Sequence, residues 1–135
     1  MENELIVLIE KEDKTNNFLR EVTSFALDKG NLVHSLYMVK ENDKYIVHML
    51  LTTDRDVEEW EFEAIYDYYE DENLKDTVST IEDADDYFNP TWHITLPYND
   101  DRVEMEILLD NILNTHFETL ENTYELIKEN KEDYI

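Results

Sequence analysis

Hydrophobic and polar residues follow two different periods along this chain, and the change of period divides it into two parts. Up to about residue 98, apolar residues form short runs or alternate with polar ones, which is typical of β-strands. From Asp101 onward they recur at steps of three and four residues, which is typical of an α-helix. The pattern predicts a single α+β domain over residues 1–135, with an antiparallel sheet in residues 1–98 and a C-terminal helix in residues 99–133 packed against it.

Four strands are expected before residue 52. Residues 5–9 are a continuous apolar run, which predicts a central strand covered on both faces. Residues 32–39 and 45–51 flank a polar, turn-like segment at 41–44 and predict a hairpin. Residues 18–27 fit both periods, because their apolar side chains also fall at helical spacing, and we expect a strand there.

The segment 59–69 alternates aromatic residues with acidic ones, and this two-residue period predicts a half-buried strand. On one face of such a strand, neighbouring carboxylates are about 6.6 Å apart. Shorter strands are expected at 77–81 and 91–96, joined by the acidic loop 82–86. The whole sheet then has about five to seven strands in a meander-like order.

One long helix is expected from Arg102 to about Asn130, on the order of 43 Å in length. Asn99, Asp100 and Asp101 are candidates for its N-cap. Its apolar stripe, which we expect to cover the sheet, consists of Met105, Leu109, Ile112, Leu113, Phe117, Leu120, Tyr124 and Ile127.

The chain has a large excess of acidic residues, and their distribution predicts a property of the surface. The chain has 35 Asp and Glu against 11 Lys and Arg, a formal net charge of −24. Residues 56–101 alone hold 16 acids and one base, Lys75, which is a net of −15. The hydrophobic content of 41% and aromatic content of 12% exclude a disordered acidic tail. The acids therefore predict one acidic face on a folded domain, which repels nucleic acid and anionic membranes and attracts basic surfaces.

Several classes of protein are excluded by missing residues. There is no cysteine, which excludes disulfides and thiolate sites, and a single glycine, Gly30, which excludes phosphate-binding glycine loops. Residues 1–4 lack the cationic flank of a signal peptide, and the apolar run 5–9 is too short to span a bilayer. We expect a cytoplasmic protein.

The residues that most often carry catalysis or bind metals show no matching motif. Residues 83–86 begin like a calcium loop, but Phe88 and Ile94 stand where the loop needs glycine and glutamate. The four histidines, His34, His48, His93 and His116, lack the spacing of a zinc site. His34 and His48 lie on opposing strands of the expected hairpin and could pair across it. His116 is expected to border the apolar stripe of the C-terminal helix. We expect no metal, no cofactor and no enzymatic activity.

The first functional hypothesis is an acidic protein-binding module. It docks on a basic surface of a nucleic-acid-handling protein or nuclease and imitates the phosphate backbone, as anti-restriction and anti-CRISPR inhibitors do. The candidate partner-binding residues are Glu59, Glu61, Glu63, Asp67, Glu70, Asp71, Glu72, Glu82, Asp83, Asp85 and Asp86.

Two alternatives stand beside this hypothesis. The chain could enclose an apolar cavity for a small ligand or a reaction, lined by Met38, Met49, Trp60, Leu109 and Phe117. Alternatively, it could be an intracellular protein whose acidity serves only solubility.

Overall fold

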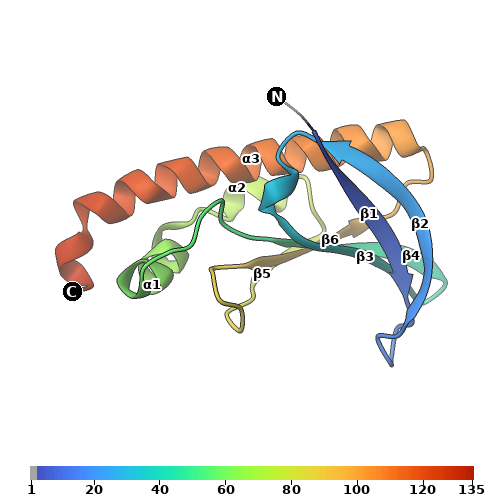
Figure 1. The fold of residues 1–135 in the computed structure, drawn as a ribbon, viewed down its shortest axis with the longest axis horizontal. Coiled ribbons are helices and arrows are strands. Elements are labelled where there is room, and N and C mark those ends of the chain that lie inside the picture. The colour runs from blue at the N-terminus through green and yellow to red at the C-terminus, as the bar shows by residue number, and fades with distance from the viewer. Residues whose placement is uncertain (1–2) are drawn as a thin grey trace.

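A six-stranded sheet packs against one long helix, and the domain is α+β as the periodicity predicts (Figure 1). The computed structural model describes residues 3–135, so Met1 and Glu2, part of the segment assessed for a signal peptide, lie outside the described residues. In chain order the elements are β1 (Glu4–Lys11), β2 (Phe18–Leu27), the short 3-10 helix η1 (Gly30–Leu32), β3 (Val33–Glu41), β4 (Lys44–Leu51), α1 (Glu59–Tyr68), α2 (Glu72–Lys75), β5 (Thr80–Asp83), β6 (Trp92–Pro97), α3 (Arg102–Glu129) and η2 (Lys131–Asp133).

The sheet has the strand order β2-β1-β3-β4-β6-β5 and is antiparallel except at one pair. β1 and β3 run parallel, with Ile9 opposite Tyr37. The chain reaches this arrangement because β2 turns back onto the outer side of β1 and η1 then carries the chain across to its inner side. The sheet is therefore mixed rather than a simple meander.

The strand expected at residues 18–27 and the hairpin expected around residues 41–44 are both confirmed. β2 pairs with β1 along its length, with bulges at two points. In the β3–β4 turn, Asn42 and Asp43 have φ values of 51° and 66°. Asn and Asp tolerate this left-handed conformation, and the resulting turn matches the twist of the two strands.

The strand expected at residues 59–69 is wrong, because this segment forms helix α1. Its buried residues are Glu61, Ala64 and Ile65, and they lie at the three- and four-residue steps of one helical face. Glu58 and Glu61 form a reciprocal capping box that satisfies backbone donors at the helix start. The sequence of this segment thus shows a two-residue alternation of aromatic and acidic residues, but its buried residues follow the helical period and form the face that packs against α3.

The two short strands exist, but their boundaries are shifted. β5 begins at Thr80 rather than at residue 77 and continues through Glu82 and Asp83, which the sequence pattern puts in a loop. β6 spans Trp92–Pro97 instead of 91–96. Residues 77–79 form a turn after α2 instead of the first half of a strand.

The core lies between the sheet and α3. Leu8, Met38, Met49 and Ile94 come from four different strands, are at most 1% exposed, and share one apolar cluster with Met105, Leu109, Ile112, Leu113, Leu120 and Ile127 of α3. The side chain of Asp101 accepts a hydrogen bond from the Glu104 backbone N–H and caps the helix. The predicted long helix is confirmed, and its C-terminal half extends past the sheet to cover α1 and α2 (Figure 1).

Side chains of α3 also cover part of the outer edge of β2. Arg102 Nε donates to the carbonyl of Ser24 at 3.0 Å, and the Ala26 N–H donates to Glu106 Oε2 at 2.9 Å. One turn further, the Asp28 N–H donates to Asp110 at 3.2 Å. These backbone groups would otherwise be available for pairing with another strand.

Among residues 3–135, no helix combines the length and the apolar character needed to cross a membrane.

Candidate functional site

Helix α1 presents a row of carboxylates on its exposed surface. Glu59, Glu63 and Asp67 are separated by four residues each and are exposed. On a helix, residues at this spacing are neighbours, with Cβ atoms about 5–6 Å apart. The row therefore lies on a helix and not on the strand expected from the sequence. It includes Glu59, Glu63 and Asp67, but not Glu61, which was expected on the same face.

Glu61 lies on the opposite side of α1 and is only 7% exposed. Its two oxygens accept hydrogen bonds from Arg55 Nη1 at 3.0 Å and Nη2 at 2.8 Å. It also accepts the backbone N–H of Glu58 at 2.8 Å. The hydrogen bond from Arg55 lowers the pKa of Glu61 and outweighs the effect of burial. Glu61 therefore stabilises the fold and does not contribute to a free acidic face.

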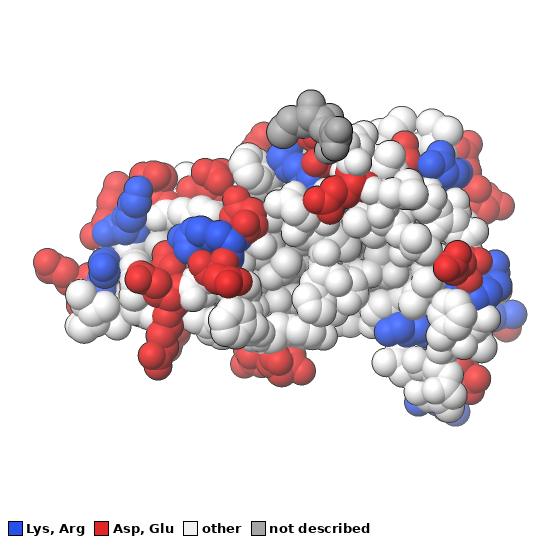
Figure 2. All heavy atoms as spheres, viewed as in Figure 1, with Lys and Arg blue, Asp and Glu red and all other residues white. Residues whose placement is uncertain are grey.

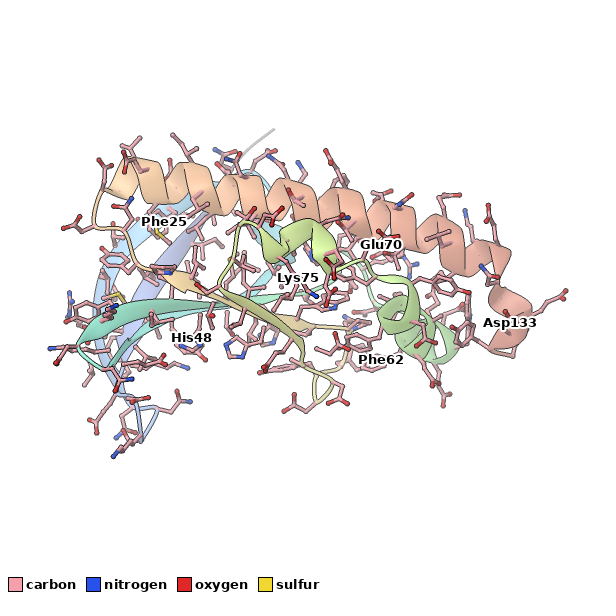
Figure 3. The ribbon with its side chains drawn as sticks, turned by 180° about the vertical axis from the view of Figure 1, so that it is seen from behind. Phe25, His48, Phe62, Glu70, Lys75 and Asp133 are labelled. Carbon is pink, nitrogen blue, oxygen red and sulfur yellow. The ribbon has the colours of Figure 1, made fainter. Side chains whose placement is uncertain are left out.

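The acids that follow α1 are partly neutralised. Lys75 Nζ lies 3.0 Å from Glu72 and 3.8 Å from Asp71, and the hydrogen bond that Lys75 donates to Glu72 raises the pKa of Lys75. Glu70 is exposed and has no ion-pair partner among residues 3–135. Figure 3 shows Glu70 and Lys75 on the α1–α2 side of the molecule.

Tyr66 holds the loop between β5 and β6 against α1. Its hydroxyl lies 3.1 Å from the carbonyl of Ala84 and 3.0 Å from that of Thr91, and it accepts the Thr91 N–H at 2.8 Å. The charges of Asp83, Asp85 and Asp86 contribute to the raised pKa of Tyr66, after the larger effect of burial. The acids of this loop therefore lie close to α1 in space.

Acids of different segments also meet at Asp83. Partial burial is the main cause of its raised pKa, followed by the negative charges of Asp71 and Asp85. Asp71 precedes α2 and Asp85 belongs to the β5–β6 loop. Asp83 therefore links the acids of α2 to those of the β5–β6 loop.

Two phenylalanines lie among these acids. Phe88, in the β5–β6 loop, is 80% exposed. It lines a surface depression of about 440 Å³ together with Val57, Glu58, Glu59, Phe62 and Glu63. Figure 3 shows Phe62 on α1, on the side that faces the loop.

We call this combined region the acidic–aromatic surface, and it consists of Glu58, Glu59, Phe62, Glu63, Asp67, Asp83, Asp85, Asp86 and Phe88. Figure 2 shows one side of the molecule: acidic side chains, with basic ones among them, gather at the end that holds α1, both signs also occur at the opposite end, and a broad, largely uncharged area lies between them. Of the eleven sequence-predicted site residues, this surface includes Glu59, Glu63, Asp67, Asp83, Asp85 and Asp86. Glu82 is exposed on the edge strand β5, outside the surface as defined.

A second polar cluster lies on the sheet face opposite α3 and was not predicted. His48 Nδ1 is 2.8 Å from His93 Nε2, and His48 Nε2 is 2.8 Å from a carboxylate oxygen of Glu41. The ring of Tyr37 stacks on that of His48 at 4.9 Å with an angle of 4°. Burial, and then the neighbouring His48, lower the pKa of His93.

His34 and His48, which the sequence allowed to pair across the hairpin, do not pair. His48 is opposite Tyr37 in the β3–β4 register, and His34 instead bonds to the Ser35 hydroxyl and contacts the ring of Tyr87. The pair that does form joins residues 45 positions apart in the chain, and no local spacing reveals such a pair.

His116 is fully buried rather than at the border of the core. Its Nε2–H donates to the carbonyl of Thr52 at 2.8 Å, and its Nδ1 accepts the hydroxyl of Tyr69 at 2.7 Å. Burial lowers the pKa of His116 to about 4, so the ring is neutral. This network ties α3 to the end of β4 and to the end of α1.

Among residues 3–135, no three side chains of His, Asp or Glu converge as a metal site normally requires. The residues of the expected ligand cavity belong largely to the packed core: Met38, Met49 and Leu109 are at most 1% exposed. Trp60 lies at the periphery, where its Nε1–H donates to Glu58 at 2.8 Å.

Comparison with known proteins identifies a family. Residues 1–135, the whole chain, match a family of unknown function, DUF6762, and the chain belongs to that family. No curated protein and no solved structure matches the chain.

Proposed function

We propose that this DUF6762 protein is a binding module without catalytic activity, and that its acidic–aromatic surface docks on the basic surface of a nucleic-acid-handling protein. Docking there competes with nucleic acid for the same basic groups, so the protein acts as an inhibitor by occlusion, in the manner of anti-restriction and anti-CRISPR proteins. The partner class implies a cytoplasmic location, with which the lack of cysteine is compatible.

The observation that carries this proposal is the carboxylate row on α1, in which Asp67 accepts a hydrogen bond from the Tyr134 hydroxyl but no member has a basic partner among residues 3–135. Glu59, Glu63 and Asp67 have no ion-pair partner among residues 3–135. Like charges four residues apart destabilise a helix by about 0.2–0.5 kcal/mol per pair. A row that weakens its own helix supports a role outside the fold, and a basic partner supplies the missing counter-charges.

Exposed aromatic rings separate this proposal from acidity that serves only solubility. Phe88 is 80% exposed and shares a depression with Phe62 and three glutamates. Exposed rings lower solubility, whereas an aromatic side chain within a charged patch provides contact area at an interface. The combination supports recognition of a protein surface rather than solvation alone.

Long-range attraction is expected to dominate the encounter between the two proteins. A net charge of −24 accelerates association with a cationic partner, and salt screens this attraction beyond a Debye length of about 8 Å at physiological ionic strength. Association should therefore slow steeply as salt increases, while the short-range contacts of Phe62 and Phe88 govern dissociation.

A pair of matched charge reversals tests the proposal. The first variant carries Glu59→Lys and Glu63→Lys on α1, and the second carries Glu118→Lys and Glu121→Lys on exposed positions of α3. Both change the net charge by the same amount, and neither touches Glu61. Each variant is used as bait in a pull-down from host cells or from cells that express candidate nucleases, washed at low and high salt.

We expect the wild type and the α3 variant to retain a basic nucleic-acid enzyme at low salt and the α1 variant to lose it. Equal capture by all three proteins would exclude the acidic–aromatic surface as the binding site. If both variants lost the partner equally, capture would depend only on the net charge of the protein, and the acidic–aromatic surface would not be a specific binding site.

A further inference from the structure

The face of the sheet opposite α3 carries a polar ladder that crosses five strands. Its members are Lys11 on β1, Tyr37 on β3, His48 on β4, His93 on β6 and Glu82 on β5. Lys11 Nζ lies 4.3 Å from the Tyr37 ring centroid, and Glu82 is opposite His93 in the β5–β6 register. Figure 3 shows that His48 projects from the sheet away from α3, and its side chain is 15% exposed.

At the centre of this ladder two imidazole rings are joined by a hydrogen bond, at a separation that a chelating pair also has. His48 Nδ1 and His93 Nε2 are 2.8 Å apart. Two imidazole nitrogens that bind one metal at about 2.0–2.1 Å, at angles between square and tetrahedral, are separated by about 2.8–3.4 Å. The two nitrogens are thus already at a chelating separation; a metal ion replaces their hydrogen bond when both rings rotate so that the two lone pairs converge, while the backbone pairing of β4 with β6 keeps both Cα atoms in place.

Glu41 supplies the carboxylate that commonly supports a metal-binding histidine. It accepts a hydrogen bond at 2.8 Å from His48 Nε2, so the ring proton of His48 resides on Nε2 and the lone pair on Nδ1. Such an outer carboxylate fixes the tautomer and the ring orientation and raises the basicity of the ligating nitrogen. The ring of Tyr37, stacked on His48, further restricts its rotation.

We propose that His48 and His93 bind a late first-row divalent metal ion, of the class of Cu²⁺, Ni²⁺ and Zn²⁺, with Glu41 orienting His48. His93 changes tautomer on binding, carrying its ring proton on Nδ1 and presenting Nε2 to the metal. Water completes the coordination shell, because no third His, Asp or Glu converges there among residues 3–135. The sequence predicts no metal site at the histidines, because His48 and His93 are 45 positions apart in the chain and only the fold brings them together.

Ligand chemistry separates this pair from the abundant carboxylates elsewhere on the protein. Imidazole nitrogen suits Cu²⁺, Ni²⁺ and Zn²⁺, whereas carboxylates alone suit Mg²⁺ and Ca²⁺. An excess of Mg²⁺ therefore occupies the acidic surfaces without displacing a late metal from the two imidazoles. The inference is independent of the proposed function, because the two histidines lie outside the acidic–aromatic surface.

The test is isothermal titration calorimetry, in which Cu²⁺ or Zn²⁺ is added to the full-length protein in the presence of excess Mg²⁺. We expect one equivalent to bind the wild type and the His34→Gln control, and no such binding in His48→Gln or His93→Gln. The Glu41→Gln variant should bind about 10–100-fold more weakly. Affinities should increase from Zn²⁺ and Ni²⁺ to Cu²⁺.

A second measurement does not depend on the variants. Substoichiometric Cu²⁺ added to the wild-type protein should broaden the NMR signals of His48 and His93 before those of His34 and His116. No saturable binding in excess Mg²⁺, or broadening that begins at the carboxylates, would overturn the proposal. Unchanged affinity in folded His93→Gln would overturn it as well.

Discussion

Residues 4–51 and residues 56–101 contribute to the same core but treat charge in different ways. In the first region, several bases have partners: Arg20 pairs with Glu10 at 2.8 Å, and Lys11 and Lys40 lie over tyrosine rings. In the second region, 16 acids share one base, Lys75, and the Arg55 that neutralises Glu61 comes from outside the region. Residues 4–51 hold 8 acids and 6 bases, a net of −2, whereas the α1 region keeps a net of −15 that only a partner or solvent can balance.

This difference separates structural acids from available ones. Glu10 and Glu61 are both under 10% exposed and both bond to an arginine. Glu59 and Glu63 are exposed and lack such a partner among residues 3–135. Burial together with an arginine thus identifies acids whose role lies in the fold, whereas Glu59 and Glu63 belong to the surface proposed to bind a partner.

The largest expected effect tests whether the two regions unfold together. Ile65 on α1 and Met49 on β4 are both fully buried in one apolar cluster. Truncation of either to alanine should lower the free energy of unfolding by about 2–5 kcal/mol in a single transition. The measurement is urea denaturation followed by both tryptophan fluorescence and far-UV circular dichroism. Two separate transitions in Ile65→Ala would show that the α1 region is a separate unit.

The next effect concerns His116, which joins the regions through Tyr69 and Thr52. Its folded pKa of about 4 lies below the value of about 6.5 in an unfolded chain, so the unfolded state binds the proton first as pH falls. This group alone should remove about 3 kcal/mol of stability between pH 7 and pH 4, and none above pH 7.

Replacement of His116 by glutamine isolates that contribution. The variant should be less stable than the wild type at pH 7, and the difference between them should shrink by about 3 kcal/mol towards pH 4. Denaturant midpoints at a series of pH values give the comparison. A difference that stays constant with pH would contradict the neutral, buried state of the ring.

The smallest effects compare two glutamates on α1. Glu61→Gln weakens the bonds to Arg55 and should cost about 1–3 kcal/mol. Glu63→Gln removes repulsion from Glu59 and Asp67 and should stabilise by a few tenths of a kcal/mol, more at low salt than at high salt. Urea denaturation at two salt concentrations distinguishes them. Equal losses from both substitutions would remove the distinction between structural and available acids.

Local sequence patterns were sufficient to predict those elements in which the hydrophobic period and the turn or capping residues indicate the same structure. The β3–β4 hairpin has strong apolar runs around a polar turn, and α3 has a long stripe with Asp101 at its start. Helix α1 was missed because five aromatic or small residues alternate with acids, which hides the buried face of Glu61, Ala64 and Ile65. The spacing of Glu58 and Glu61 as a capping box was the available signal.

Contacts between distant segments account for the rest of what the sequence did not reveal. Parallel pairing of β1 with β3 depends on how β2 crosses to the sheet edge, which no single strand pattern specifies. The pairs His48–His93 and Tyr69–His116 join residues more than forty positions apart. The acidic composition indicated a charged face, but only the fold separates Glu61 from its neighbours on α1.

The hydrogen bonds from α3 to β2 have a consequence for how this protein behaves at high concentration. Arg102, Glu106 and Asp110 occupy backbone groups of Ser24, Ala26 and Asp28 that a second molecule would need in order to add a strand. Growth of a fibre from this rim therefore requires the first turns of the helix to detach. Conditions that fray that end of α3 should shorten the lag before fibrils form, even while the sheet beneath remains folded.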